Sequence, residues 1–221
     1  MPTIELMALA LGCYLWGSLS PAQCAALRVG HADLTRLGSG SVGGSNVGEQ
    51  LGLNWLIAVG IADVLKGMLP VVACRIAASD PVPAVLAGIA AVAGHNWSVY
   101  LDFRGGRGIA ATLGAVTAWD WRLAALFLAM LAAGRALRRA PEATIAAILL
   151  LTPASLAAGI GNATAMGCAS LGALAIAKRL EANRIPLPRD GAARRTVLLR
   201  RLLMDRDVPR DEPWQERKLI S

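Results

Sequence analysis

Residues 53–77 read LNWLIAVGIADVLKGMLPVVACRIA, and this stretch decides the class of fold. About 20 predominantly apolar residues are enough for a helix to cross the hydrocarbon core of a bilayer. The stretch is apolar over most of its length, yet Asp63 and Lys66 lie near its middle. It therefore predicts a transmembrane helix that carries two ionisable side chains at membrane depth.

Six further apolar segments accompany this one. Hydrophobic residues make up 55% of the 221 residues, which is more than an ordinary soluble domain contains. The first run follows no basic region, so we expect a membrane span and not a cleaved signal. The sequence thus predicts an all-α, polytopic membrane protein with about seven transmembrane helices joined by short Gly-rich loops. The other six segments are 4–27, 82–101, 106–119, 122–138, 142–159 and 161–177.

Basic residues lie in alternate loops between these segments. Arg28 follows the first segment, Arg104 and Arg107 precede the fourth, and Arg138 precedes the sixth. More than half of the 22 Lys and Arg residues lie from Lys178 onward, behind the last segment. Cytoplasmic loops of membrane proteins carry an excess of such residues. We therefore expect a multi-pass protein of the cell (inner) membrane, with its N-terminus outside and its tail in the cytoplasm.

The chain divides at the prolines of Ile185–Pro188, which end the last apolar helix. We expect a membrane domain over residues 1–184 and a cytoplasmic basic tail over 185–221. Within the tail, Ala192–Met204 places leucines against arginines in the pattern of an amphipathic helix in the headgroup layer. A basic tail behind apolar spans indicates membrane lipids as partners, and no motif for nucleic acid is present. The tail is not expected to form part of the active site.

Two glycine-rich stretches fall on the predicted cytoplasmic side. Residues 38–46 read GSGSVGGSN and residues 104–108 read RGGRG. Backbone without bulky side chains can turn several N–H groups toward one anion. In a bilayer such backbone persists only where it is buried in protein or lines a wet cavity. The two stretches together predict a site for a phosphate-bearing ligand at the cytoplasmic face.

Arg107 is the main candidate for a phosphate ligand. It stands between glycines at the start of a helix, where the positive end of the helix dipole favours anions. The alternative is that Arg107 only anchors the loop at the membrane face, as Arg104 would. For the first stretch the alternative is a plain flexible linker, although serine hydroxyls suit an anion. The other candidates for substrate binding in the two stretches are Ser39, Ser45, Asn46, Gly105 and Gly106.

Asp63 and Lys66 are three residues apart, so they share one face of their helix. Ionisable groups at this depth are costly and usually face a cavity or each other. Lys66 is therefore either a cation for phosphate or half of a structural ion pair, and the sequence leaves both interpretations open.

His95 closes the third segment and precedes the second glycine-rich stretch. It is a candidate to handle a proton or to donate a hydrogen bond to an oxyanion. The alternative is a histidine with a structural hydrogen bond. His31 is the other histidine, and neither is accompanied by a cluster of cysteines or carboxylates. We therefore expect no metal and no cofactor.

Four blocks of the chain resemble, in order, motifs of the bacterial membrane glycerol-3-phosphate acyltransferases that use acyl phosphate, the PlsY family. Tyr14–Ser18 resembles its Gly-Ser of the first span, and Asp33–Asn46 is similar to its glycine-rich first motif. Asp63–Gly67 resembles its Asp-x-Leu-Lys-Gly, and Gly94–Thr112 resembles its Gly-His block. The four blocks cover about residues 10–115, half of the chain.

The resemblance implies transfer of a fatty acyl group from acyl phosphate to glycerol 3-phosphate, which gives lysophosphatidic acid for phospholipid synthesis. It implies that Ser39, Ser45 and Asn46 belong to the first motif. His95 and Arg107 belong to the second, Arg107 standing where the family has Lys. The mechanism we favour is direct transfer without a covalent enzyme intermediate, in which positioning and charge stabilisation supply most of the barrier reduction. His95 and Ser39 are then the expected catalytic residues.

The chain also departs from the family pattern. Glu49 stands where the family usually has Arg, the third, Ser-containing motif is not found, and only Arg179–Asn183 remains of the closing element. These departures favour one alternative, a non-catalytic homologue that binds phosphorylated lipid precursors. A second alternative is a small transporter of phosphorylated solutes, although no inverted repeat is visible. Oligomeric state and acyl chain length do not follow from the sequence.

The orientation is testable by cysteine labelling in intact cells. In the variants Ser41→Cys and Arg104→Cys, we expect no labelling by a membrane-impermeant maleimide from outside and full labelling after permeabilisation. Strong labelling from outside would contradict both the orientation and a shared cytoplasmic site.

Overall fold

A computed structural model describes residues 1–30, 33–209 and 211 of the chain. His31 and most of the end of the tail lie outside the described residues. Within them the secondary structure is helical, and one isolated bridge pairs Ser98 with Arg104. The α-helices are α1 (Thr3–Ser18), α2 (Pro21–Val29), α3 (Gly44–Leu51), α4 (Leu53–Ala77), α5 (Pro81–Asn96), α6 (Ile109–Trp119), α7 (Trp121–Ala136), α8 (Ala140–Ala157), α9 (Asn162–Glu181) and α10 (Gly191–Met204). Short 3₁₀ helices lie at η1 (Leu34–Arg36), η2 (Val99–Leu101) and η3 (Ala182–Arg184).

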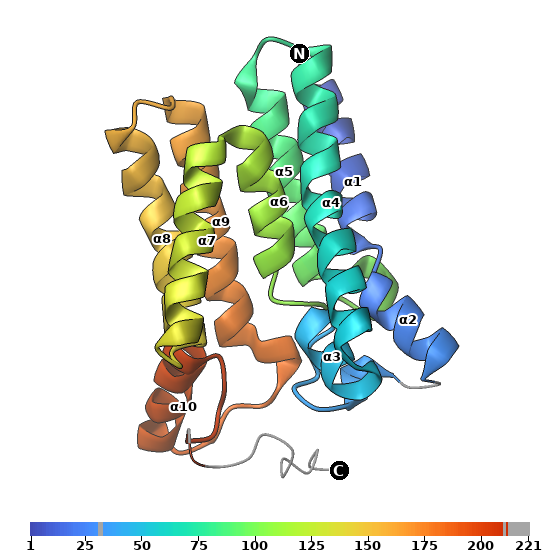
Figure 1. Ribbon diagram of the computed structural model, residues 1–221, viewed down its shortest axis with the longest axis vertical. Helices are drawn as coiled ribbons and strands as arrows, with labels where there is room; N and C mark the ends of the chain where they lie inside the picture. Colours follow the sequence, from blue (N-terminus) through green and yellow to red (C-terminus); the bar gives the residue numbers. More distant parts are fainter. Residues whose placement is uncertain (31–32, 210, 212–221) are drawn as a thin grey trace.

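The long helices form two groups that lie side by side (Figure 1). In one group α1 packs on α5, and α4 packs on α5 and α6; in the other α8 packs on α7 and α9. The contacts of α5 with α9 and of α6 with α7 join the groups. Successive long helices alternate in direction (Figure 1). The N-terminus lies at one end of the bundle, and α2, α3 and α10 lie at the other.

The all-α prediction is confirmed, with a correction to the first segment. The predicted span 4–27 is two helices, because the chain turns at Leu19 and Ser20. The Ser20 side chain accepts a hydrogen bond from the backbone N–H of Gln23 at 3.2 Å, and Pro21 supplies the first helical position. Both features are helix-starting signals. A new helix therefore begins there and lies at the end of the bundle.

The number of complete membrane crossings stays a prediction. Among the described residues, three segments are long and apolar enough to cross a membrane, namely Thr3–Val29, Leu53–Ala77 and Ala140–Ala157. Helices α5 and α6 are apolar but shorter. The 11 residues of α6 rise about 16 Å, roughly half of the hydrocarbon thickness. The predicted span 106–119 therefore forms a helix of about half the length of a complete crossing.

Glycines allow two helix pairs to pack backbone against backbone. A Cβ atom at Gly17 of α1 would clash with the carbonyl of Ala91 in α5, and one at Gly94 would clash with the carbonyl of Tyr14. In the second pair, a Cβ atom at Gly67 of α4 would clash with the carbonyl of Ala111 in α6. Small residues of this kind are typical of close helix packing in membranes. These crossings fix α5 and α6 against the first half of the bundle.

A second, smaller hydrophobic core lies beneath the first glycine-rich stretch. Its buried residues come from α2, η1, α3 and α4 and include Ala26, Leu34, Val47 and Val59. The main core lies between α4–α9 and includes the fully buried Phe127. The glycine-rich segment is thus packed on an apolar base, which a plain flexible linker would lack.

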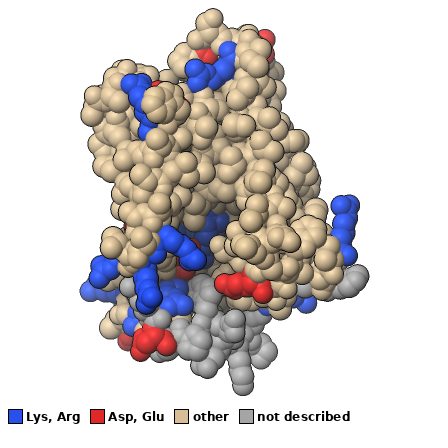
Figure 2. Space-filling view, in the orientation of Figure 1, with Lys and Arg blue, Asp and Glu red and all other residues tan. Residues whose placement is uncertain are grey.

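Charged side chains gather at the end of the molecule that carries α2, α3 and α10, and a broad uncharged band separates them from a smaller charged group at the opposite end (Figure 2). The end with α2, α3 and α10 contains the loops in which the sequence places most of its arginines. The surface therefore has the pattern of a protein whose middle faces lipid and whose more basic end faces water.

The tail packs more tightly than an amphipathic helix that only rests in the headgroup layer. Helix α10 lies against α8 and α9. Arg201 is buried, forms a two-point ion pair with Asp207, and donates hydrogen bonds to the carbonyls of Leu180 and Ile185 at 2.9 Å. The Arg179 guanidinium donates to the Leu202 carbonyl at 2.6 Å. The expected amphipathic helix forms, but Arg201 of α10 and Arg179 of α9 also anchor it to the bundle.

The close crossing of α1 and α5 gives a stability prediction. Gly17→Ala should lower the free energy of unfolding by about 1–3 kcal/mol, because the added methyl meets backbone that cannot move aside cheaply. Gly12→Ala is the matched control on the same helix, where a Cβ atom would meet nothing within 4 Å. Thermal unfolding in detergent, followed by a thiol-reactive dye at the buried cysteines, measures both. Equal melting temperatures for the two variants would show that the crossing is not close-packed.

Candidate active site

A cavity of about 690 Å³ opens at the basic end of the bundle. Polar groups from the first glycine-rich stretch and the start of α3 line it, including Ser39, Ser45 and Asn46. Apolar side chains of α4, α6 and α7 line it as well, including Leu56, Leu113 and Leu131. Figure 2 shows a hollow at this end of the molecule with basic and acidic atoms inside it. The cavity is therefore amphipathic, and the leucines of α4, α6 and α7 form its apolar wall.

Two helices begin at this cavity, so their N-termini face it. Gly43 precedes α3 and Gly108 precedes α6, both glycines line the cavity, and no side chain caps either helix. The first N–H groups of a helix have no intrahelical partner and carry the positive end of its dipole. Gly108 has a left-handed backbone (φ 73°), which lets the chain turn from the Arg107 loop directly into α6. The cavity thus receives two positive helix ends, which suits anionic groups.

Arg107 extends into the same space from the turn before α6. Its Nε lies 3.0 Å from Oδ1 of Asp205, and its Nη1 donates to the carbonyl of Lys178 at 3.1 Å. The side chain is 13% exposed and lines the cavity. Geometry therefore brings Arg107 together with the two helix N-termini, although a carboxylate from the tail already contacts it.

His95 and Asp63 form a buried pair at the inner end of the cavity. Nδ1 of His95 lies 3.4 Å from Oδ1 of Asp63, and both residues line the cavity. The same carboxylate oxygen lies 3.0 Å from Nζ of Lys66. An oriented histidine beside an anchoring carboxylate can accept or donate a proton at its other ring nitrogen.

Lys66 has a different position from the one that a phosphate ligand would need. Its ammonium group also donates to the carbonyl of Leu19 at 2.8 Å, and its side chain is 5% exposed. It is not among the residues that line the cavity in the described part of the chain. The geometry favours the second interpretation of the sequence, a structural ion pair, and indicates that Lys66 acts by holding Asp63.

Gly105 and Gly106 of the second stretch support the loop beside His95 and, unlike Gly108, are not among the described residues that line the cavity. Gly106 donates its N–H to the carbonyl of His95 at 3.1 Å, and a Cβ atom on Gly106 would clash with Nε2 of the imidazole. Gly105 donates its N–H to Oδ1 of Asn183 at 3.3 Å. The expected donation of these two N–H groups to phosphate is replaced by contacts that fix the loop.

Asn183 joins both glycine-rich stretches to the end of α9. Its Nδ2 donates to the carbonyls of Gly40 at 2.9 Å and Gly105 at 3.2 Å, while Oδ1 accepts from Nζ of Lys178 at 2.7 Å. The backbone of Asn183 is left-handed (φ 54°), a conformation that Asn tolerates better than most residues. The sequence shows this Asn as the remnant of a closing motif; the structure gives it the role of a clamp.

Asn46 mainly holds the first glycine-rich loop in place, whereas the serines Ser39 and Ser45 line the cavity. Nδ2 of Asn46 lies within 3.3 Å of the carbonyls of Leu34, Leu37 and Ser41, so the amide fixes the loop. Its Oδ1 is buried and has no hydrogen-bond partner among the described residues. Ser39 and Ser45 line the cavity. Oγ of Ser39 accepts a hydrogen bond from the Ser41 N–H at 3.3 Å, and its own O–H can still be donated to a ligand.

Sequence reasoning missed the part of the site that the tail contributes. Met204, Asp205 and Arg206 line the cavity, although the tail was expected to lie apart from it. Arg138, before α8, lines it as well. The available signal was the charged run that follows the amphipathic helix, but its position depends on how α10 folds back. Glu49 also lines the cavity, on the exposed face of α3.

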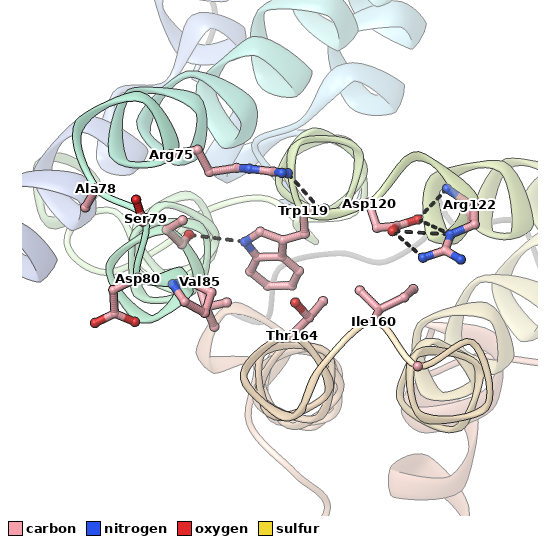
Figure 3. Close-up of a pocket in the computed structure, with 13 residues that line it drawn as sticks. Arg75, Ala78, Ser79, Asp80, Val85, Trp119, Asp120, Arg122, Ile160 and Thr164 are labelled. Carbon is pink, nitrogen blue, oxygen red and sulfur yellow. Dashed lines mark hydrogen bonds and ion pairs between the residues drawn. The ribbon is translucent and has the colours of Figure 1, made fainter.

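A second cavity, of about 440 Å³ (Figure 3), lies at the opposite end of the bundle, where α4 ends and α5 begins. Its polar groups already serve the protein. The Arg75 guanidinium donates to the carbonyls of Ala118 and Trp119, and the Trp119 indole donates to the Ala84 carbonyl at 3.1 Å. Asp120 pairs with Arg122 at 2.9 Å. These contacts cap helix ends, so the cavity at the basic end is the better candidate site. No group of three metal-ligating side chains occurs in the described residues.

The shared carboxylate of Asp63 gives a prediction about stability. Asp63→Asn should lower the free energy of unfolding by about 3 kcal/mol, because Lys66 stays buried without its counter-charge. The double variant Asp63→Leu/Lys66→Met should recover most of that loss, since it removes both charges. Chemical unfolding in detergent micelles measures both variants. A double variant as unstable as the single one would show that the ion pair is not the cause.

The comparisons with known proteins agree with this geometry. A family model described as glycerol-3-phosphate acyltransferase matches residues 7–185. A glycerol-3-phosphate acyltransferase of Shouchella clausii is 38% identical over 133 residues, which cover 59% of this chain and 62% of that protein. Glycerol-3-phosphate acyltransferase 2 of Moorella thermoacetica is 41% identical over 114 residues, 51% of this chain and 57% of that protein. The match thus spans somewhat more than half the length of these curated relatives.

Two solved structures share the fold over most of the chain. The crystal structure of PlsY, an integral membrane glycerol 3-phosphate acyltransferase, in its glycerol 3-phosphate form superposes with a TM-score of 0.72 at 30% identity. The lysophosphatidic acid form gives 0.69 at 28% identity, and both cover 80% of this chain and 89% of the other. The chain is a polytopic helical membrane protein and belongs to the glycerol-3-phosphate acyltransferase family.

Proposed function

We propose that this protein transfers a fatty acyl group from acyl phosphate to glycerol 3-phosphate, giving lysophosphatidic acid for phospholipid synthesis. The observation that carries the proposal is the amphipathic cavity, in which Arg107 and two uncapped helix N-termini meet beside an apolar wall. A ligand that fits this cavity has a phosphate at one end and a hydrocarbon chain at the other. Membership of the family supports the same reaction.

Two helix N-termini suit a reaction with two phosphorylated substrates. Glycerol 3-phosphate and acyl phosphate each bring an anion, and these like charges must be held close enough for the glycerol hydroxyl oxygen to reach the acyl carbonyl carbon. The N-terminus of α3 and that of α6 with Arg107 offer two cationic positions in one cavity. Each position lowers the electrostatic cost of bringing its phosphate near the other.

The apolar wall supplies a place for the acyl chain. Leu56, Leu113 and Leu131 line it, and Leu56 is partly exposed at the outer surface of α4. A chain that leaves the cavity along this wall continues into the surrounding lipid. Burial of each methylene contributes about 0.8 kcal/mol, so a long chain binds largely through the bilayer itself.

His95 is the residue we propose to move the proton. With Nδ1 directed at Asp63, Nε2 can accept the proton of the glycerol hydroxyl. The hydroxyl oxygen then attacks the acyl carbonyl carbon, the new ester bond forms, and the bond to phosphate breaks. Inorganic phosphate leaves and can take the proton. Ser39 is proposed to donate a hydrogen bond in this step and Ser45 to donate one to a phosphate, while Asn46 holds the loop that positions them.

The proposed site faces the cytoplasm of a cell membrane. Glycerol 3-phosphate is a small water-soluble ion and has to enter from an aqueous side. The basic end of the molecule, which contains the cavity and the tail, is the cytoplasmic side by the positive-inside rule. The N-terminus, at the opposite end of the bundle, then faces outward.

A second candidate function is binding of phosphorylated lipid precursors without catalysis. The observation that favours it is Glu49, which places a carboxylate on the wall where anions are to bind. Purified protein with acyl phosphate and labelled glycerol 3-phosphate separates the two candidates. Formation of labelled lysophosphatidate supports the enzyme, and binding of both ligands without product supports the second candidate.

Arg107→Ala tests the phosphate ligand. The change should remove a charge-assisted contact of about 1.5–3 kcal/mol and lower kcat/KM about tenfold to a few hundredfold. Arg107→Lys should keep most activity, because a point charge can serve a phosphate. Arg104→Ala is the control, since Arg104 is exposed and outside the cavity lining. If the two alanine variants lose activity equally, Arg107 is not a specific ligand.

Glu49→Arg tests the repulsive group. We expect the KM for glycerol 3-phosphate to fall, because a cation replaces an anion on the cavity wall. At about 4 Å, two unit charges interact by about 1 kcal/mol even in bulk water, so the expected change is several-fold. Gln50→Arg, on the neighbouring exposed position, is the control. An unchanged KM would show that glycerol 3-phosphate does not bind beside α3.

A further inference from the structure

The tail beyond the family match returns to the candidate site. The family model ends at residue 185, and the described chain continues through α10 to a turn at Asp205–Asp207. Oδ1 of Asp205 lies 3.0 Å from Nε of Arg107, with side chains 21% and 13% exposed. The Asp205 carboxylate, from a segment outside the family match, thus forms an ion pair with the Arg107 guanidinium that is proposed to bind phosphate.

Two buried arginines fix the tail in this position. Arg201, at 2% exposure, pairs with Asp207 on the far side of the turn that carries Asp205. Arg179 of α9 donates to the carbonyls of Leu202 and Leu203, at the end of α10. These contacts fix the turn, and the fixed turn places Asp205 beside Arg107.

The environment of Asp205 itself is unfavourable for a carboxylate. Burial raises its pKa above the usual value, and the neighbouring Asp207 adds to this rise, although Arg107 and Arg179 act in the opposite direction. Asp205 follows the C-terminus of α10, where the helix dipole disfavours negative charge. Its backbone is left-handed (φ 54°), and Oδ1 makes no hydrogen bond of good geometry. The contact with Arg107 is an ion pair that a better-placed anion can replace.

We propose that Asp205 is a tethered competitor of substrate phosphate, which sets the affinity of the site for phosphorylated ligands. This rests on the proposed function of Arg107 as the phosphate ligand. Without substrate, the Asp205 carboxylate pairs with Arg107 and lines the cavity together with Met204 and Arg206. When a phosphate binds, its several oxygens and larger charge displace the single carboxylate, and the turn moves away from Arg107. The tail thereby raises the phosphate concentration that the site requires.

Asp205→Asn tests the competitor in the full-length protein. The amide keeps the shape of the side chain and removes its charge, so binding of inorganic phosphate and of glycerol 3-phosphate should become about threefold to tenfold tighter. KM should fall by a similar factor with little change in kcat. Titration calorimetry of the purified protein in lipid nanodiscs measures binding directly, without any need for turnover.

Three further variants separate competition from a general effect on the fold. Asp205→Glu keeps the charge and should bind phosphate like the wild type. Asp207→Asn weakens the anchor at Arg201, frees the turn and should also tighten binding. Asp211→Asn removes one exposed negative charge from the same tail outside the cavity lining and should change nothing. Trypsin cleavage at the arginines of α10 reports whether the tail stays folded in each variant.

The outcomes are distinct. Tighter binding in Asp205→Asn and Asp207→Asn, with Asp211→Asn unchanged, supports the proposal. If the wild type binds glycerol 3-phosphate and Asp205→Asn binds it equally or more weakly, the proposal fails while the acyltransferase function stands, and Asp205 only positions Arg107. If neither protein binds either phosphate, the proposed function fails and this inference fails with it.

Discussion

The backbone contact between α4 and α6 is the constraint on which the site depends. Gly67 of α4 removes the side chain that would hold α6 away, and Gly114 of α6 does the same from the other side, where a Cβ atom would meet the carbonyl of Val64. Because α6 begins only after Gly108, this close packing sets the depth at which its N-terminus ends. Asp63 and Lys66 lie one turn or less from Gly67 on α4. The same crossing therefore fixes the ion pair, the imidazole beside it and the positive helix end.

The remaining parts of the site are held by side-chain amides and not by helix packing. Asn46 fixes the first glycine-rich loop through three carbonyls, and Asn183 connects that loop to the second one. Backbone carbonyls that a helix would have satisfied find partners here in these two amides. This explains how irregular backbone persists inside a membrane protein: it is enclosed by protein and lines a polar cavity.

The sequence predicts the helical class, the basic end and the meeting of the two glycine-rich stretches, because periodicity, charge asymmetry and motif spacing are local properties. It identifies Arg107, His95, Ser39 and Ser45 as cavity residues for the same reason. It does not separate the two interpretations of Lys66, since the deciding contact is with the carbonyl of Leu19, far along the chain. Ser20 and Pro21 are a helix-start signal, but the prediction of one continuous span over 4–27 left no place for a new helix there. The place of Asp205 depends on the tertiary packing of α10, which no local pattern contains.

The partly exposed apolar wall has a thermodynamic consequence for how an acyl chain enters and leaves the cavity. On the proposed reaction, an acyl chain of about 16 carbons would cost on the order of 10 kcal/mol to bring into water, at about 0.8 kcal/mol per methylene. A wall formed by Leu56, Leu113 and Leu131 lets the chain stay in hydrocarbon through binding, transfer and release. Only the headgroup then crosses between phases, and the bilayer serves as the reservoir for both donor and product. On this proposal the protein works at a boundary between two solvents, and dissociation of the product is a lateral step in the membrane plane.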